Sequence, residues 1–176
     1  MTIDLYASDE QDYVKMNVTK WSQLAESALH DEGVRGSAEV SLIFVDEDAI
    51  ADLNERFMGK SGPTDVLSFP IDDEPIPVPL PNSQVNESAV VDIPQLVGDI
   101  VICPEVAVAQ AASHAGTVDD ELALLVVHGV LHILGWDHDT ADKTLAMQQR
   151  EREILVAHHW RGDIPATFSQ TVPEGA

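Results

Sequence analysis

Three histidines occur within eleven residues, in the stretch HGVLHILGWDH at 128–138. The first two, His128 and His132, lie in an apolar segment with helical periodicity, where side chains four residues apart share one face, about 5–6 Å apart. Gly135 is typical of the residue that ends a helix, so a chain reversal there can return His138 to the same place. Three unrelated histidines are the alternative, but burying two imidazoles without a shared partner is unfavourable. The spacing therefore predicts a metal ion held by His128, His132 and His138.

The type of donor indicates which metal such a site would hold. Three neutral imidazoles suit Zn²⁺ and leave a fourth tetrahedral position for water, which ionises near neutral pH when it is zinc-bound. We expect one zinc ion per chain, although nickel or copper could bind the same donors. Metzincin peptidases share these intervals, but they carry a glutamate general base directly after the first histidine. Gly129 stands there in this chain, and it indicates a different reaction or a different base.

The elements that must position the histidines follow a mixed α/β pattern. Alternating or β-branched apolar runs predict strands, and apolar residues at helical spacing with capping residues predict helices. The predicted strands span 1–10, 38–47, 64–70 and 96–103, and the predicted helices span 17–33, 46–59, 104–116, 118–135 and 139–160. We expect an α/β (α+β) fold with a small mixed sheet and about five helices, and with the zinc site at the end of a core helix.

The length and the distribution of proline indicate one domain. We expect it to cover residues 1–162, followed by a flexible C-terminal tail at 163–176. The segment 71–95 contains five prolines among acidic and small polar residues. Because predicted strands flank it closely, we interpret this segment as a long acidic loop within the domain and not as a domain boundary.

The composition limits the classes of partner and the compartment. Nine basic residues against 31 acidic ones give a net charge of −22, which argues against broad electrostatic attachment to nucleic acid or to an anionic membrane. Cys103 is the single cysteine, so no intrachain disulfide can form, and we expect it to be a small buried apolar residue. The chain shows no signal peptide and no apolar run approaching the roughly 20 residues of a membrane span. We expect a cytoplasmic protein.

Further motifs resemble one known family. HGVLHILGWDH is similar to the H-G-x-L-H-x-x-G-[YW]-D-H signature of the YbeY family, bacterial endoribonucleases of rRNA maturation. TDVLSFP at 64–70 and GDIVI at 98–102 agree with that family in order and spacing, and LNERF at 53–57 is also similar. The resemblance covers roughly residues 38–155.

The resemblance carries its own expectations about structure and function. It implies one α/β domain with a central four-stranded sheet, and a zinc ion held by His128, His132 and His138. It implies cleavage of single-stranded RNA in 16S rRNA 3′-end maturation and ribosome quality control, with rRNA and the small ribosomal subunit or its proteins as partners. Neither DNA nor a membrane is an expected partner. Two alternatives are a zinc metallohydrolase of another substrate, such as a peptide, and a ribosome-associated factor whose zinc is structural.

The sequence departs from the family at one position of interest. The family commonly has arginine after the aromatic residue of the helix end, and Met58 stands there in this chain. Lys60, or Arg56 just upstream, could supply positive charge to a phosphate, although lysine lacks the planar bidentate donor of arginine. We take Lys60 as a candidate catalytic residue.

Two polar residues near the motifs are further candidates. Asp137 could orient a metal-binding histidine or accept a proton, or it could be a residue of the turn. Ser68 lies on a strand that could line the cleft, where it would contact substrate or form a local hydrogen bond. The SHAGT stretch at 113–117 is shifted from the GHS pattern of the family, so His114 receives no predicted role.

Overall fold

Four strands and five α-helices are built from residues 3–34, 38–71 and 95–170, the part of the chain that the computed structural model describes. In chain order they are β1 (Ile3–Glu10), α1 (Val18–Asp31), β2 (Ala38–Val45), α2 (Glu47–Leu53), β3 (Val66–Pro70), β4 (Gln95–Ile102), α3 (Pro104–Gln110), α4 (Val118–Ile133) and α5 (Ala141–Leu155). Three of the predicted helices continue into a turn of another geometry: π-helical at Asn54–Met58 and Val156–Trp160, and 3₁₀ at Ala111–Ser113.

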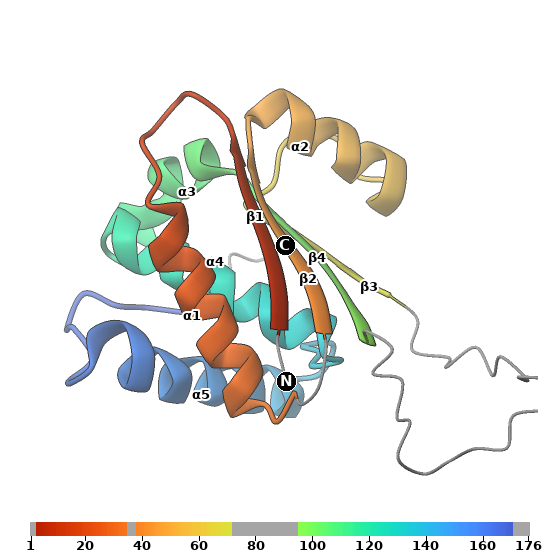
Figure 1. Cartoon of the computed structure of the whole chain (residues 1–176). Coiled ribbons are helices and arrows are strands. Elements are labelled where there is room, and N and C mark those ends of the chain that lie inside the picture. Colours follow the sequence, from red (N-terminus) through yellow and green to blue (C-terminus); the bar gives the residue numbers. More distant parts are fainter. Residues whose placement is uncertain (1–2, 35–37, 72–94, 171–176) are drawn as a thin grey trace, which may run out of the picture.

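The strands form one mixed sheet in the order β1-β2-β4-β3. β1, β2 and β4 are parallel, whereas β3 is antiparallel to β4 and lies at the edge (Figure 1). A parallel pair needs a crossover connection, and α1 supplies it between β1 and β2. The predicted α/β class with a small mixed four-stranded sheet and five helices is therefore confirmed.

The main core lies between the sheet and the helices α1, α4 and α5, which lie on one side of it (Figure 1). α4 is the central helix and packs against α1, α5, β3 and β4. Its N-terminus is set by Thr117, whose hydroxyl accepts the backbone N–H of Asp120, and its acidic first turn suits the helix dipole. Val40, Leu42 and Phe44 alternate along β2 and face this core.

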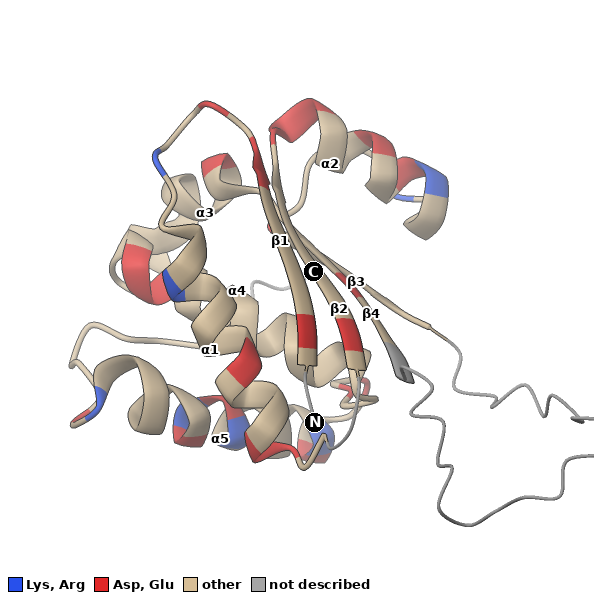
Figure 2. Ribbon diagram, in the orientation of Figure 1, with Lys and Arg blue, Asp and Glu red and all other residues tan. Residues whose placement is uncertain are grey.

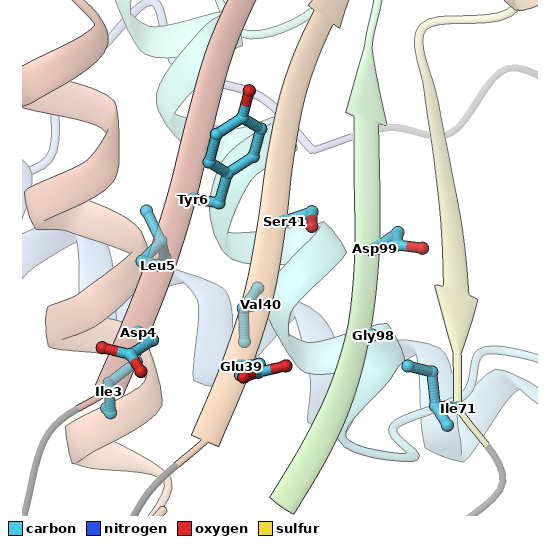
Figure 3. A pocket seen from close by; sticks show the side chains of 10 residues that line it. All are labelled: Ile3, Asp4, Leu5, Tyr6, Glu39, Val40, Ser41, Ile71, Gly98 and Asp99. Carbon is cyan, nitrogen blue, oxygen red and sulfur yellow. The ribbon is translucent and has the colours of Figure 1, made fainter. Parts of the chain in front are cut away.

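The opposite face of the sheet is only partly covered. α2 packs a smaller cluster, including Ile50, Leu67 and Val101, over one end of the strands. Beyond α2 the sheet forms an open pocket of about 510 Å³, in which Figure 3 shows Tyr6 and the carboxylates of Asp4 and Asp99. Figure 2 shows acidic residues near the ends of β1 and β2, and Asp4 and Glu39 line this pocket. Negative charge makes it a poor surface for RNA phosphates.

Two expectations from the sequence concern the burial of Cys103 and whether any helix could span a membrane. Cys103 is fully buried, as predicted, and burial raises the pKa of its thiol. In the described ranges no helix has the length and apolar character needed to cross a membrane.

The two segments expected to be loop and tail are described only in part. Residues 72–94 of the predicted loop and 171–176 of the predicted tail lie outside the described residues. Within the expected tail, the rings of Phe168 and Trp160 meet edge to face at 4.7 Å. Gln170 exchanges two hydrogen bonds with Gln148 of α5. These contacts hold residues up to 170 against α5, while the boundary at 162 stays a prediction.

Candidate metal centre

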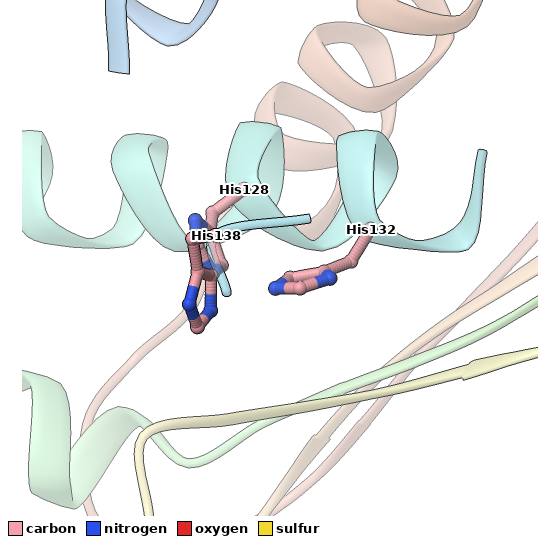
Figure 4. Close-up of side chains that lie close together, drawn as sticks. All are labelled: His128, His132 and His138. Atoms are coloured by element: carbon pink, nitrogen blue, oxygen red, sulfur yellow. The ribbon is translucent and has the colours of Figure 1, made fainter. Parts of the chain in front are cut away.

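The structure brings His128, His132 and His138 together (Figure 4). One ring nitrogen of each lies within 4.8 Å of the others, and the ring centroids are 4.7–5.6 Å apart. Figure 4 shows the imidazoles of His128 and His132 extending from α4 toward the strands, with the ring of His138, from the chain after the helix, beside them. The three donors are close enough for one ion to bind all of them through small rotations of the imidazoles.

The end of α4 returns the chain to the site. Gly135 has φ +98°, a left-handed conformation that favours glycine. Its N–H donates to the carbonyl of His132, and the N–H of Trp136 donates to the carbonyl of Leu131, both at 3.0 Å. This is a Schellman motif, which satisfies the last carbonyls of the helix and reverses the chain. Glycine at this position therefore allows His138 to join two residues of the helix.

Asp137 lies in the same chain reversal after α4. Its Oδ1 accepts the backbone N–H of His138 at 2.7 Å. The carboxylate thus positions His138 through the backbone and not through the ring, as expected of a turn residue. Asp137 is exposed, and its role as a proton acceptor stays a prediction.

A buried carboxylate from another helix orients His128. Glu151 of α5 is 3% exposed, and its Oε2 lies 3.1 Å from Nδ1 of His128. A carboxylate at Nδ1 favours the tautomer that carries its proton there, which leaves Nε2 free for a metal ion. Glu151 was not among the residues predicted from the sequence. Its signal was present, because Glu151 shares the apolar face of α5 with Met147, Ile154 and Leu155, where a lone carboxylate needs a partner.

Electrostatics at the site also suit a cation. Burial lowers the pKa of His132 to about 4, and positive charge on His128 and His138 acts in the same direction. His132 is therefore a neutral donor at physiological pH, which is the form that binds metals. An all-imidazole donor set fits Zn²⁺.

Glycine is required at position 129 by the packing of α4 against β4. A Cβ at this position would lie 2.6 Å from Cγ2 of Ile100, so glycine permits the close approach of α4 to β4. No larger side chain fits without a shift of the core. The glutamate that peptidases of similar spacing carry here would collide with the sheet.

Ser68 lies on the strand that passes the histidines. Val66 packs in the core that contains α4, whereas Leu67 and Phe69 pack in the cluster under α2. Because side chains alternate along a strand, Ser68 lies on the same face of β3 as Val66. Ser68 therefore lies on the side of β3 that faces α4, and its contact with a substrate stays a prediction.

A second polar network lies at the other end of α4. Glu121 is fully buried, and its two oxygens lie 2.8 and 2.9 Å from Nδ1 of His114. The amide of Gln110 donates to Glu121 and to Asp65, both at 2.8 Å, which ties α3, α4 and the start of β3 together. His114 had no predicted role because the SHAGT stretch is shifted from the family pattern, but its ring pairs with Glu121 only seven residues away.

The ionisation of this pair follows from its contacts. The hydrogen bond with Glu121 raises the pKa of His114, against the effect of burial. Burial alone would raise the pKa of Glu121, but the hydrogen bonds that it accepts hold that pKa below its ordinary value. His114 and Glu121 therefore form an ion pair at mildly acidic pH.

The family model described as Endoribonuclease YbeY matches residues 6–159, which include every histidine and carboxylate of the metal centre. The chain belongs to the YbeY family. Endoribonuclease YbeY of Salinispora tropica is 43% identical over 138 residues, covering 78% of this chain and 84% of the relative. That of Acidothermus cellulolyticus is 45% identical over 141 residues, covering 80% and 81%.

A solved structure agrees with the YbeY assignment. The solution structure of TM1509 from Thermotoga maritima has a TM-score of 0.53 and 26% sequence identity, covering 91% of this chain and 92% of that one. Together with the relatives, which are nucleases and hence hydrolases by name, this makes the chain a member of an enzyme family.

The side chain that stands where the family resemblance predicts arginine is partly exposed. Met58 is 44% exposed at the end of the π-helical turn. Arg56 pairs with Asp52 at 3.4 Å, one helical turn away. Lys60 is exposed in the loop that leads to β3, where its backbone N–H donates to the carbonyl of Asn54 at 3.3 Å. The loop is thus anchored to the helix end, and the role of Lys60 toward phosphate stays a prediction.

Proposed function

We propose that this YbeY family member is a zinc-dependent endoribonuclease that cuts single-stranded RNA in 16S rRNA 3′-end maturation and ribosome quality control. The observation that carries the proposal is the triad of His128, His132 and His138, with Glu151 behind the first ring. Membership of a family whose relatives are named endoribonucleases supports the substrate class.

The residues around the triad suit the hydrolysis of a phosphodiester. When bound, a zinc ion supplies an acidified water and positive charge beside the phosphate. Glu151 holds the His128 ring in the orientation that a metal requires. The Ser68 hydroxyl, on the β3 face turned toward α4, contacts a phosphate oxygen of the substrate. Lys60 contributes charge at the entrance, and Asp137 takes up the proton of the attacking water.

The charge of the chain indicates how RNA reaches the site. A protein with a net charge of −22 makes few phosphate contacts and binds free RNA weakly. The small ribosomal subunit or one of its basic proteins supplies the targeting, in the cytoplasm. Neither a membrane nor DNA is part of this proposal.

One experiment distinguishes the proposed function from two alternatives, a peptidase and a factor with a structural zinc. The purified full chain is incubated with single-stranded RNA, double-stranded RNA, single-stranded DNA and casein, each with and without a chelator. The proposal expects cleavage of single-stranded RNA that the chelator abolishes. Cleavage of casein would indicate a peptidase, and the absence of cleavage from protein that retains its metal would indicate a structural zinc.

A further inference from the structure

An aromatic side chain is exposed close to the edge of the sheet. Phe57, in the π-helical turn after α2, is 63% exposed. Its ring meets that of Phe69 on β3 edge to face, with centroids 5.4 Å apart and an interplanar angle of 68°. Phe69 is partly buried against the cluster under α2. The Phe57 ring therefore packs against Phe69 while most of its surface faces solvent.

The backbone around Phe57 is held in place. Gly59 ends the turn with φ +66°, and its N–H donates to the carbonyl of Glu55 at 3.2 Å. The buried side-chain amide of Asn54 donates to the carbonyl of Gly62 at 2.9 Å, which fastens the following loop to the turn. A ring on such a support loses little conformational freedom when it binds a ligand.

The aromatic pair, Phe57 and Phe69, lies across one strand from the metal centre. Leu67 and Phe69 face the α2 side of β3, and Val66 and Ser68 face the α4 side, which carries the histidines. Among the described strands β3 pairs with β4 alone, so no described strand lies at its other edge. An RNA strand that reaches both the histidines and the exposed ring would have to cross this edge.

The charge near the aromatic pair permits the approach of a polyanion. Arg56 and Lys60 flank Phe57 and balance the carboxylates of Asp52 and Glu55, so residues 52–60 are neutral in a chain of net charge −22. Figure 2 shows basic residues at the far end of the α2 ribbon, acidic residues at its start, and further acidic residues at the ends of β1 and β2. The neutral region is also the one beside β3.

We propose that Phe57, supported by Phe69, is a stacking platform for one base of the single-stranded RNA that crosses the β3 edge into the metal centre. This inference rests on the proposed function and adds a substrate-binding residue to it. Every base has a π-face, so a platform of this kind binds without sequence preference. It also selects single strands, because the bases of a duplex are already stacked on one another. Stacking contributes to binding and not to bond cleavage, so Phe57 affects KM more than kcat.

The test compares four variants of the full chain with the wild type. Binding of a fluorescent single-stranded RNA and its cleavage kinetics are measured for Phe57→Leu, Phe57→Ala, Phe57→Trp and Tyr13→Ala. Leucine keeps an apolar contact with Phe69 but has no π-face, and tryptophan restores one. Tyr13 is 58% exposed and lies in the connection after β1, so it is the matched control. Thermal unfolding is recorded for each variant to confirm that it folds.

We expect Phe57→Leu and Phe57→Ala to weaken RNA binding and raise KM on the order of 10-fold, with kcat changed by less than about 2-fold. Phe57→Trp should bind as the wild type or more tightly, and Tyr13→Ala should bind as the wild type. If the wild type cuts RNA and Phe57→Leu has the same RNA affinity and KM as Tyr13→Ala, the stacking proposal is wrong and the proposed function stands. A wild type that neither binds nor cuts RNA overturns both proposals.

Discussion

Nδ1 of His128 lies 3.1 Å from the carboxylate of Glu151, which is contributed by α5 and almost fully buried. Such a partner fixes the ring orientation and makes the opposite nitrogen a better ligand, an effect typically worth 10–100-fold in metal affinity. Glu151→Gln should therefore lower the zinc affinity by about 10-fold or more while the protein stays folded. Competition with a chromophoric chelator measures this affinity.

Glu153→Gln is the matched control for that experiment. Glu153 lies on the same helix and pairs with Arg150 at 2.9 Å, in a half-exposed position. Its loss should leave the zinc affinity unchanged. Equal affinities for Glu151→Gln and Glu153→Gln would mean that the contact with His128 has no role in metal binding.

Gly129 should resist substitution for reasons of packing. Alanine favours a helix over glycine by about 1 kcal/mol, but a Cβ at this position would lie 2.6 Å from Cγ2 of Ile100, and overpacking costs about 1–3 kcal/mol. Gly129→Ala should thus lower the free energy of unfolding by about 1 kcal/mol in urea titrations. Adding Ile100→Leu, which removes the branch at Cβ, should recover part of the loss. A single variant more stable than the wild type contradicts the close approach.

The ion pair of His114 and Glu121 should stabilise the fold most within a limited range of pH. Because the pKa of His114 is raised above its ordinary value of 6.5, its charge stabilises the fold below pH 6.5, and this contribution is lost as the pH rises through the folded-state pKa. Because the pKa of Glu121 is lowered from 4.5, its contribution is complete above pH 4.5 and is lost as the pH falls through the folded-state pKa. The pair should stabilise most between pH 4.5 and 6.5.

Urea titrations of the wild type and His114→Gln across this range measure that contribution. The difference in unfolding free energy should reach about 1–2 kcal/mol inside the window and decrease on both sides. His30→Gln is the control, since His30 and Glu26 form an exposed pair at 3.8 Å whose loss should have little effect. A difference that does not vary with pH would show that the pair is not ionic.

A substitution at Met58 should increase the activity of the protein. The Met58 side chain is partly exposed, two residues before Lys60, so an arginine can replace it without burying a charge. Met58→Arg should raise the rate of RNA cleavage severalfold by adding a bidentate phosphate donor, and Lys60→Ala should lower it severalfold. Single-turnover cleavage assays measure both. Unchanged rates in both variants would mean that charge at this helix end is irrelevant.

The metal triad was predictable because its information is local. The spacing of His128 and His132 is a property of any α-helix, and Gly135 is a recognisable helix end, so the return of His138 follows from three nearby signals. The strands and helices were found for the same reason, since periodicity and capping act over a few residues. Helix ends differed where the last turn became π-helical or 3₁₀, a change that the apolar pattern does not record.

The supporting contacts could not be predicted because they join distant parts of the chain. Glu151 is 23 residues from His128, and Gln110 is 45 residues from Asp65. Only the packing of α4 against α5, α3 and the start of β3 makes these pairs neighbours. The carboxylate of Glu151 on an apolar helix face was a sign that a partner exists, but not of which one.

Zinc titration of metal-free protein tests the central claim most directly. Protein stripped by a chelator receives increasing Zn²⁺ while cleavage of a single-stranded RNA is followed, with a His128→Ala/His132→Ala variant in parallel. Cleavage should be absent from the stripped protein, rise with added zinc and reach a plateau at one ion per chain, and it should stay absent from the variant. Full cleavage by the stripped protein, or restoration of the variant by zinc, would contradict a catalytic metal at the three histidines.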